Sequence, residues 1–127
     1  MSGDSMGCTI STHVLDSTTG VPAAGVTVVL ESLDAGDDLA DGERRVAGHG
    51  VTDADGRLRF SPDAEGGSEG GLPAGEYSLT FGTGEYFRQR GIRSFYPKVT
   101  VTFTVTSGHY HVPLLLSPFA YSTYRGS

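Results

Sequence analysis

Cysteine is nearly absent from this chain of 127 residues: Cys8 is the single one, so no disulfide can form within the chain. Its neighbours would not activate the thiol, so we expect Cys8 to be structural. No apolar run reaches the length of a membrane span. Residues 1–7 also lack the basic and apolar regions of a secretory signal. These absences lead us to expect a cytoplasmic protein without a membrane partner.

Positive charge is also scarce, because nine Lys and Arg stand against fifteen Asp and Glu, for a net charge of −6. This balance argues against non-specific binding to nucleic acid or to acidic membranes. The sequence holds no glycine-rich phosphate loop, no Gly-x-Ser-x-Gly elbow and no Cys-x-x-Cys pair. A local group of cations could still bind an anionic substrate.

What the chain does have is glycine and proline, with 19 and six residues that are spread out as turns of an all-β protein would be. Short alternating segments predict strands at 8–15, 25–33, 44–51, 58–60, 76–81, 96–106, 109–117 and 121–125. A helix is predicted at 84–90, with Thr83 as its N-cap and Gly91 at its end. Seven to eight strands with one short helix predict a two-sheet antiparallel β-sandwich.

We expect one domain over residues 8–127, preceded by a flexible lead over 1–7. Residues 63–71, rich in glycine and acids, are predicted to form a mobile surface loop. The Ser107-Gly108 turn predicts a hairpin that joins 96–106 to 109–117.

The predicted strand at 109–117 carries two histidines, His109 and His111. Residues i and i+2 of a strand project to one face, so the two imidazoles are expected together. The alternative is a pair of exposed polar positions. His13, inside the first strand, is on its own more typical of a half-buried structural histidine, and His49 of the surface.

Arg57 follows a glycine turn, where its guanidinium could hold a planar anionic or amide-bearing molecule through two parallel hydrogen bonds. A solvated surface arginine is the alternative. The chain ends on Tyr124, Arg125, Gly126 and Ser127, polar groups that could bind a ligand or dock the last strand. The preceding run 112–116 is apolar on both faces, and another subunit is the simplest cover for the outer one.

The histidines could in principle hold zinc. However, His-x-His with a distant His13 is a weak metal signal without a nearby carboxylate or thiolate. We therefore predict no metal and no other cofactor.

Several segments together resemble a known family: Ser-Thr-His-Val-Leu-Asp at 11–16, Pro-Ala-Ala-Gly-Val at 22–26, Thr-Asp-Ala-Asp-Gly-Arg-Leu at 52–58, Phe-Tyr-Pro at 95–97, His-Tyr-His-Val-Pro-Leu-Leu-Leu-Ser-Pro at 109–118 and Tyr-Arg-Gly-Ser at 124–127. They resemble the transthyretin-like 5-hydroxyisourate hydrolases of urate catabolism, over roughly residues 8–127. The terminal Tyr-Arg-Gly-Ser is the most specific of these motifs.

This resemblance implies a transthyretin-like β-sandwich that assembles as a homotetramer, a dimer of dimers, with active sites between dimers. It implies hydrolysis of 5-hydroxyisourate to 2-oxo-4-hydroxy-4-carboxy-5-ureidoimidazoline, in which histidine-activated water attacks a ring C–N amide-type bond. By resemblance the catalytic residues are His13, Arg57, His111 and Ser127. The substrate-binding residues would be His13, Arg57, Tyr124, Arg125 and His109.

Three alternatives stay open. The first is a non-enzymatic transthyretin-like carrier of small aromatic ligands, which would have no use for the histidine pair and the terminal tetrapeptide. The second is a structural module, because 21–29, 52–59 and 72–77 also resemble carboxypeptidase-regulatory-like domains. The third is a zinc-dependent amidohydrolase, which a chelator would inactivate.

Overall fold

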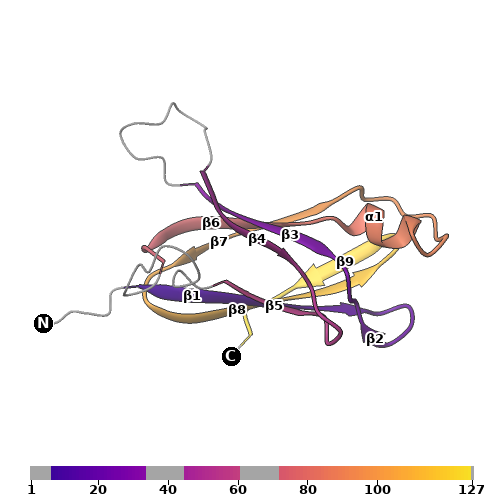
Figure 1. The fold of residues 1–127 in the computed structure, drawn as a ribbon, viewed down its shortest axis with the longest axis horizontal. Helices are drawn as coiled ribbons and strands as arrows, with labels where there is room; N and C mark the ends of the chain where they lie inside the picture. Colours follow the sequence, from indigo (N-terminus) through magenta and orange to yellow (C-terminus); the bar gives the residue numbers. More distant parts are fainter. Residues whose placement is uncertain (1–6, 34–44, 61–71, 127) are drawn as a thin grey trace, which may run out of the picture.

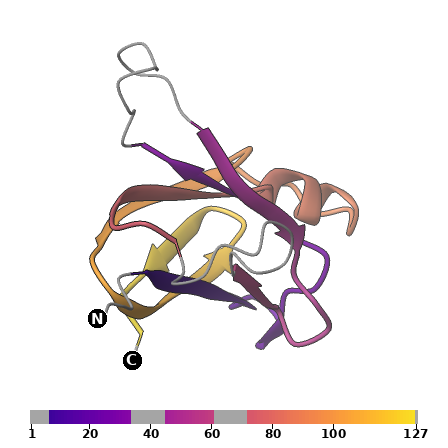
Figure 2. The same cartoon turned by 60° about the vertical axis from the view of Figure 1, so that its left-hand side comes forward.

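Two β-sheets stack face to face around one apolar core (Figure 1). The computed structural model describes residues 7–33, 45–60 and 72–126. One sheet contains β1 (Cys8–Asp16), β2 (Val21–Pro22), β5 (Arg57–Phe60), β8 (Gly108–Ser117) and β9 (Ala120–Thr123). The other contains β3 (Thr27–Ser32), β4 (Arg45–Val51), β6 (Gly75–Phe81) and β7 (Val99–Val105). Helix α1 (Thr83–Arg88) lies at one end of the second sheet (Figures 1 and 2).

The predicted all-β sandwich with one short helix is therefore confirmed over the described residues. The additional strand β2 lies in a segment that the sequence predicted as turn, and it pairs with the end of β1. The predicted flexible lead, apart from Gly7, and the predicted mobile loop at 63–71 lie outside the described residues. No helix in the described ranges combines the length and apolarity that a membrane crossing needs.

The predicted hairpin between 96–106 and 109–117 is wrong, because β7 and β8 belong to different sheets. β7 pairs with β6, whereas β8 pairs along its length with β1. That second pair is parallel, so the expectation of a wholly antiparallel sandwich is also wrong. Both strands carry apolar residues on one face, and each covers the common core from its own side. The chain at Gly108, with φ of +97°, crosses between the sheets.

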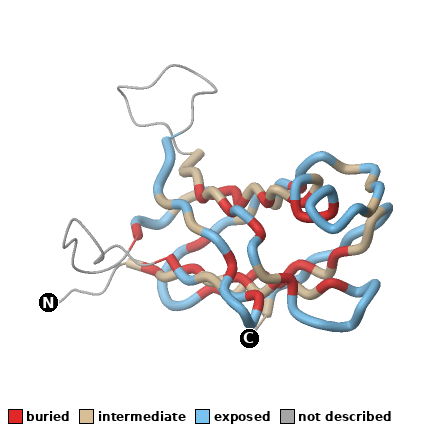
Figure 3. The backbone as a smooth tube through the Cα atoms, turned by 45° about the vertical axis from the view of Figure 1, so that its right-hand side comes forward, coloured by how far each residue is buried: buried red, intermediate tan, exposed pale blue. Residues whose placement is uncertain are grey.

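Alternation along β1 and β8 decides which side chains face the core and which remain outside (Figure 3). Ile10, Val14, Leu114 and Leu116 point inward and are almost wholly buried. Burial of each such side chain contributes roughly 1.5–3 kcal/mol. Cys8 is 1% exposed, and burial raises the pKa of its thiol, which agrees with the structural role expected for it.

Helix α1 begins one residue earlier than predicted, and Gly82 is its N-cap. The prediction of Thr83 as N-cap is wrong: its Oγ1 donates a hydrogen bond to the carbonyl of Tyr96, 3.3 Å away. Gly91 has a φ of +71°, which allows the N–H of Ile92 to return to the carbonyl of Phe87. The predicted glycine end of the helix is therefore present.

Replacing Tyr86 by Phe is expected to destabilise the fold by about 1–3 kcal/mol, because a buried carboxylate loses a donor. The Tyr86 hydroxyl donates to Oδ2 of Asp16 at 2.8 Å, and Asp16 is 2% exposed. Burial and the Asp16 carboxylate raise the pKa of Tyr86 to about 12, so the phenol stays protonated. Urea denaturation would measure the loss. The matched control Tyr121→Phe removes a phenol that is 41% exposed, and its effect should stay within about 0.5 kcal/mol.

Candidate active site

The pairing of β1 with β8 and β5 gathers the predicted histidines of these strands and Arg57 on the outer face of their sheet. In the parallel pair, Ser11 lies beside His111. In the antiparallel pair, His13 lies beside Arg57. Cross-strand partners share a face, so these side chains form one group, with His13 two residues from Ser11 on the same strand. His13, Arg57 and His111, which are 98 residues apart at most, thus lie on one face of the sheet.

A cavity of about 450 Å³ opens on this face. It is lined by Ser11, Thr12, Asp53, Arg57, Leu58, Arg59, His109 and His111. Two guanidinium groups and two imidazoles dominate the lining, together with one carboxylate. Such a lining suits a small planar molecule that carries negative charge or carbonyl oxygens.

A tight turn places Arg57 at the start of β5. The side chain of Asp53 accepts hydrogen bonds from the N–H groups of Asp55 and Arg57, at 2.9 and 3.0 Å. These bonds, with the nearby Arg57 charge, hold the pKa of Asp53 below its usual value. Gly56 takes a φ of +75°, and a Cβ there would lie 2.5 Å from the carbonyl oxygen of Val14. The turn is therefore fixed by glycine geometry and by an acidic side chain.

Two glycines in β4 let the inner side of β5 approach closely. A Cβ at Gly48 would lie 2.9 Å from Phe60, and one at Gly50 would lie 2.9 Å from Leu58. Two glycines inside a strand would ordinarily weaken it. Here the absence of a Cβ leaves room for the side chains of Leu58 and Phe60, which pack β5 against β4. This packing fixes the strand that carries Arg57.

A chain of hydrogen bonds links the two histidines of β8 to hydroxyl groups of β1. Ser11 Oγ lies 2.8 Å from Nδ1 of His111 and 3.0 Å from Nε2 of His109. Thr9 Oγ1 lies 2.6 Å from Nδ1 of His109. Both ring nitrogens of His109 are therefore engaged by protein, which leaves its ring face and edge to the cavity.

His111 has a lowered pKa. Its partial burial is the first cause, and the neighbouring His13, His109 and Arg57 add positive charge that disfavours protonation. The imidazole is therefore neutral at neutral pH and able to accept a proton. This is the electrostatic property that a general base requires.

The end of the chain lies against His111. The N–H of Gly126 donates to the carbonyl oxygen of His111 at 2.8 Å. A Cβ at Gly126 would lie 2.6 Å from Cδ2 of the His111 ring, so glycine is needed for this approach. Ser127, predicted to be catalytic, lies outside the described residues.

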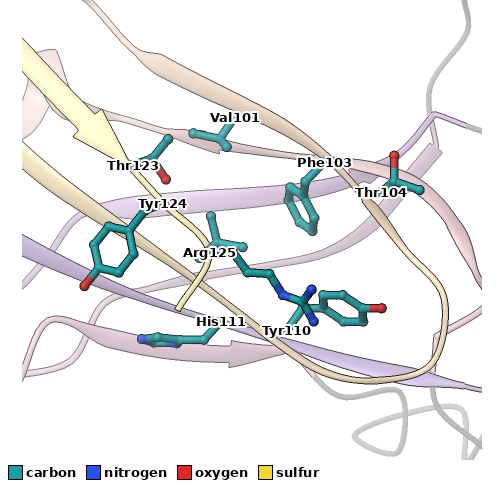
Figure 4. A pocket seen from close by; sticks show the side chains of 9 residues that line it. Val101, Phe103, Thr104, Tyr110, His111, Thr123, Tyr124 and Arg125 are labelled. Atoms are coloured by element: carbon teal, nitrogen blue, oxygen red, sulfur yellow. The ribbon is translucent and has the colours of Figure 1, made fainter. Parts of the chain in front are cut away.

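Tyr124 and Arg125, predicted to bind substrate, line a second cavity of about 250 Å³ between the two sheets. The Arg125 guanidinium lies over the ring of Tyr110, 4.6 Å from its centroid. Figure 4 shows the Tyr124 ring pointing away from that guanidinium, toward the side where His111 lies. Within this single chain, neither residue lines the cavity of Arg57, whereas His111 borders both cavities.

The sequence did not point to three residues that hydrogen-bond to the candidate site residues, namely Thr9, Ser11 and Asp53. Ser11 precedes His13 by two positions in a strand, and that spacing alone places it on the same face. Its contact with His111 depends on the parallel β1–β8 pairing, which the sequence does not reveal. His49, predicted to be on the surface, is exposed on β4.

The described ranges contain no group of three His, Cys, Asp or Glu side chains arranged to hold a metal ion. His109 and His111 are held instead by Ser11 and Thr9.

A β-sandwich of two sheets, one of which carries histidines and an arginine on its outer face, defines the class of protein. The model of the HIUase/Transthyretin family matches residues 10–126. The chain therefore belongs to the HIUase/Transthyretin family.

Relatives and solved structures agree with this assignment. The 5-hydroxyisourate hydrolase of Deinococcus radiodurans is 45% identical over 123 residues, which cover 93% of this chain and 95% of the relative. The structure of Klebsiella pneumoniae 5-hydroxyisourate hydrolase aligns with a TM-score of 0.76 and 39% identity, over 94% of this chain and 99% of that one. Sea bream transthyretin in complex with thyroxine aligns with a TM-score of 0.75 and 30% identity, over 92% and 93% of the two chains.

Proposed function

We propose that this protein is a 5-hydroxyisourate hydrolase. The observation that carries the proposal is a cavity on the sheet face that is lined by His111, His109 and Arg57. His13 lies beside Arg57 across the β1–β5 pair, and the lowered pKa of His111, caused first by its partial burial, suits a proton acceptor. The similarity to hydrolases such as that of Deinococcus radiodurans supports the same choice of substrate.

Hydrolysis opens a ring by breaking a C–N bond. His111 takes a proton from water as the water oxygen attacks the ring carbonyl carbon. The negative charge that develops on the carbonyl oxygen is stabilised by Arg57. The C–N bond then breaks, and the departing nitrogen receives a proton from an imidazolium. His13 and His111 share the two proton transfers, and no covalent enzyme intermediate is required.

The remaining residues complete the substrate site in this proposal. Tyr124 hydrogen-bonds a ring carbonyl or the hydroxyl group, and Arg125 adds positive charge for an anionic substrate. His109 offers its ring face to a planar substrate, since its nitrogens are engaged. Ser127 polarises a histidine or the water through its hydroxyl. In one chain the side chains of Tyr124 and Arg125 line the neighbouring cavity, and in this proposal they turn toward the cavity of Arg57 to reach the substrate.

We further propose a homotetramer, a dimer of dimers. Leu115 on the outer face of β8, together with Phe119 and Tyr121, forms an apolar surface that a second subunit would cover. Phe119 is 62% exposed and Tyr121 is 41% exposed in the single chain. The small-molecule substrate is the other expected partner, and the lone buried Cys8 fits a cytoplasmic location.

The ultraviolet decay of freshly prepared 5-hydroxyisourate, measured against its spontaneous decay, tests the activity. We expect strong acceleration by the folded protein, unchanged by a chelator. Acceleration that a chelator removes would favour the zinc-dependent alternative. No acceleration by a folded protein would reject the hydrolase and direct attention to the carrier alternative, which sea bream transthyretin represents.

The pH profile gives a second test of His111 as base. Because its pKa is lowered, His111 loses its proton at a pH below that of an ordinary histidine, near 6.5. The acidic limb of kcat/KM for the free enzyme is therefore expected below about pH 6.5, with activity falling as pH drops further. A limb above pH 7 would contradict the role of a neutral His111.

A further inference from the structure

Ser11 connects the proposed base to a second imidazole. Its Oγ lies within hydrogen-bond distance of Nδ1 of His111 and of Nε2 of His109, and Thr9 closes the chain at Nδ1 of His109. The parallel register sets Thr9 beside His109 and Ser11 beside His111, so strand pairing holds these contacts in place.

A serine hydroxyl carries one proton, so Ser11 can donate to one imidazole while it accepts from the other. In one direction, Nδ1–H of His111 donates to Ser11, Ser11 donates to Nε2 of His109, and Nδ1–H of His109 donates to Thr9. In the other direction every bond is reversed. Neutral His111 then accepts at Nδ1 and carries its proton on Nε2.

The two directions give Nε2 of His111 opposite chemistry. When Nδ1–H of His111 donates to Ser11, Nε2 has a free lone pair and can accept a proton. When Ser11 donates to Nδ1, Nε2 carries the proton and cannot accept one. We propose that Ser11 is a positioning residue that holds His111 in the tautomer with its proton on Nδ1, so that Nε2 can accept a proton from water. The inference rests on the proposed function, because a reaction that begins with proton removal needs that lone pair. Histidine bases are held in this way when Nδ1–H donates to a fixed acceptor.

Among the described residues, Ser11 is the one whose side chain lies within hydrogen-bond distance of the His111 ring. Gly126 packs against Cδ2 of His111, and its N–H engages the backbone carbonyl of His111 rather than the ring. Partial burial, followed by the positive charge of His13, His109 and Arg57, lowers the pKa of His111, so the ring holds a single proton near neutral pH. The acceptor at Nδ1 then decides where that proton lies.

The first experiment uses ¹⁵N NMR of histidine-labelled protein above pH 7, where the two neutral tautomers have distinct nitrogen shifts. We expect His111 to carry its proton on Nδ1 in the wild-type protein and in Ser11→Thr, which keeps the hydroxyl. In Ser11→Ala the population should move toward the Nε2–H tautomer. The control Ser17→Ala removes the hydroxyl of an exposed serine just after β1 and should match the wild type. A wild-type proton on Nε2, or a tautomer that Ser11→Ala leaves unchanged, would overturn the proposal.

The second experiment separates kcat from KM with 5-hydroxyisourate. Ser11→Ala should lower kcat by about tenfold to a hundredfold, because a mispositioned base forfeits part of the 10²–10⁴-fold that general bases contribute. KM should change by less than about threefold, and Ser11→Thr should recover most of kcat. An unchanged kcat in Ser11→Ala would reject the positioning role. Should the wild-type protein fail to turn over 5-hydroxyisourate, the proposed function fails, and the NMR result still decides whether Ser11 sets the tautomer.

Discussion

Replacing His111 by Asn is expected to lower kcat for 5-hydroxyisourate by about 10²–10⁴-fold. Asn resembles the imidazole in size and can still hydrogen-bond to Ser11, but it cannot accept a proton at neutral pH. Because partial burial and neighbouring positive charge lower the pKa of His111, the imidazole is neutral at neutral pH, and the loss is expected in the chemical step. Steady-state kinetics with freshly prepared substrate would measure it, and KM should change far less than kcat.

His49→Asn is the matched control for this variant. His49 is exposed on β4, in the sheet that does not carry the cavity, and its replacement should leave kcat within about twofold. Urea denaturation should give similar midpoints for both variants. A His111→Asn protein that keeps near-normal turnover would remove His111 from the role of base.

The sequence predicted the local placement of His13 and Arg57 better than it predicted how the strands pair. Alternation along 8–15 placed His13 opposite the buried Val14, and the structure shows His13 on the outer face. The Asp-Gly turn before Arg57 was equally visible, because glycine and Asx turns act over a few residues. These signals are local, so a single sequence contains them.

Partners that are far apart in sequence could not be predicted in this way. The Ser107-Gly108 segment is compatible both with a hairpin and with a crossing from one sheet to the other. The chain crosses, because β8 pairs with β1 and not with β7. The contact of Ser11 with His111 follows from that choice. Arg125 is the converse case, because resemblance placed it at the substrate, whereas in the single chain its guanidinium lies over Tyr110. The resemblance transfers the identity of this residue, whereas the position of its side chain comes from the structure.

Deleting residues 125–127 is expected to lower kcat/KM by at least about 10²-fold while the sandwich remains folded. Strand β9 ends at Thr123, so the deletion removes no strand residue and no core side chain. It removes the hydrogen bond from Gly126 to the backbone of His111 and the contact of Gly126 with the ring. The ring becomes more exposed and less fixed, so its pKa should rise and its alignment with water should worsen.

Two single substitutions separate the parts of this effect. Arg125→Ala keeps the Gly126 contact and removes the guanidinium, so it should raise KM more than it lowers kcat. Gly126→Ala places a Cβ 2.6 Å from Cδ2 of His111, and it should lower kcat by displacing the ring or the terminal segment. The ¹⁵N shifts of His111 should change in Gly126→Ala and stay close to the wild type in Arg125→Ala. A truncated protein whose turnover stays within about threefold of the wild type would show that the terminus does not position the base, because both its contacts with His111 would then be dispensable.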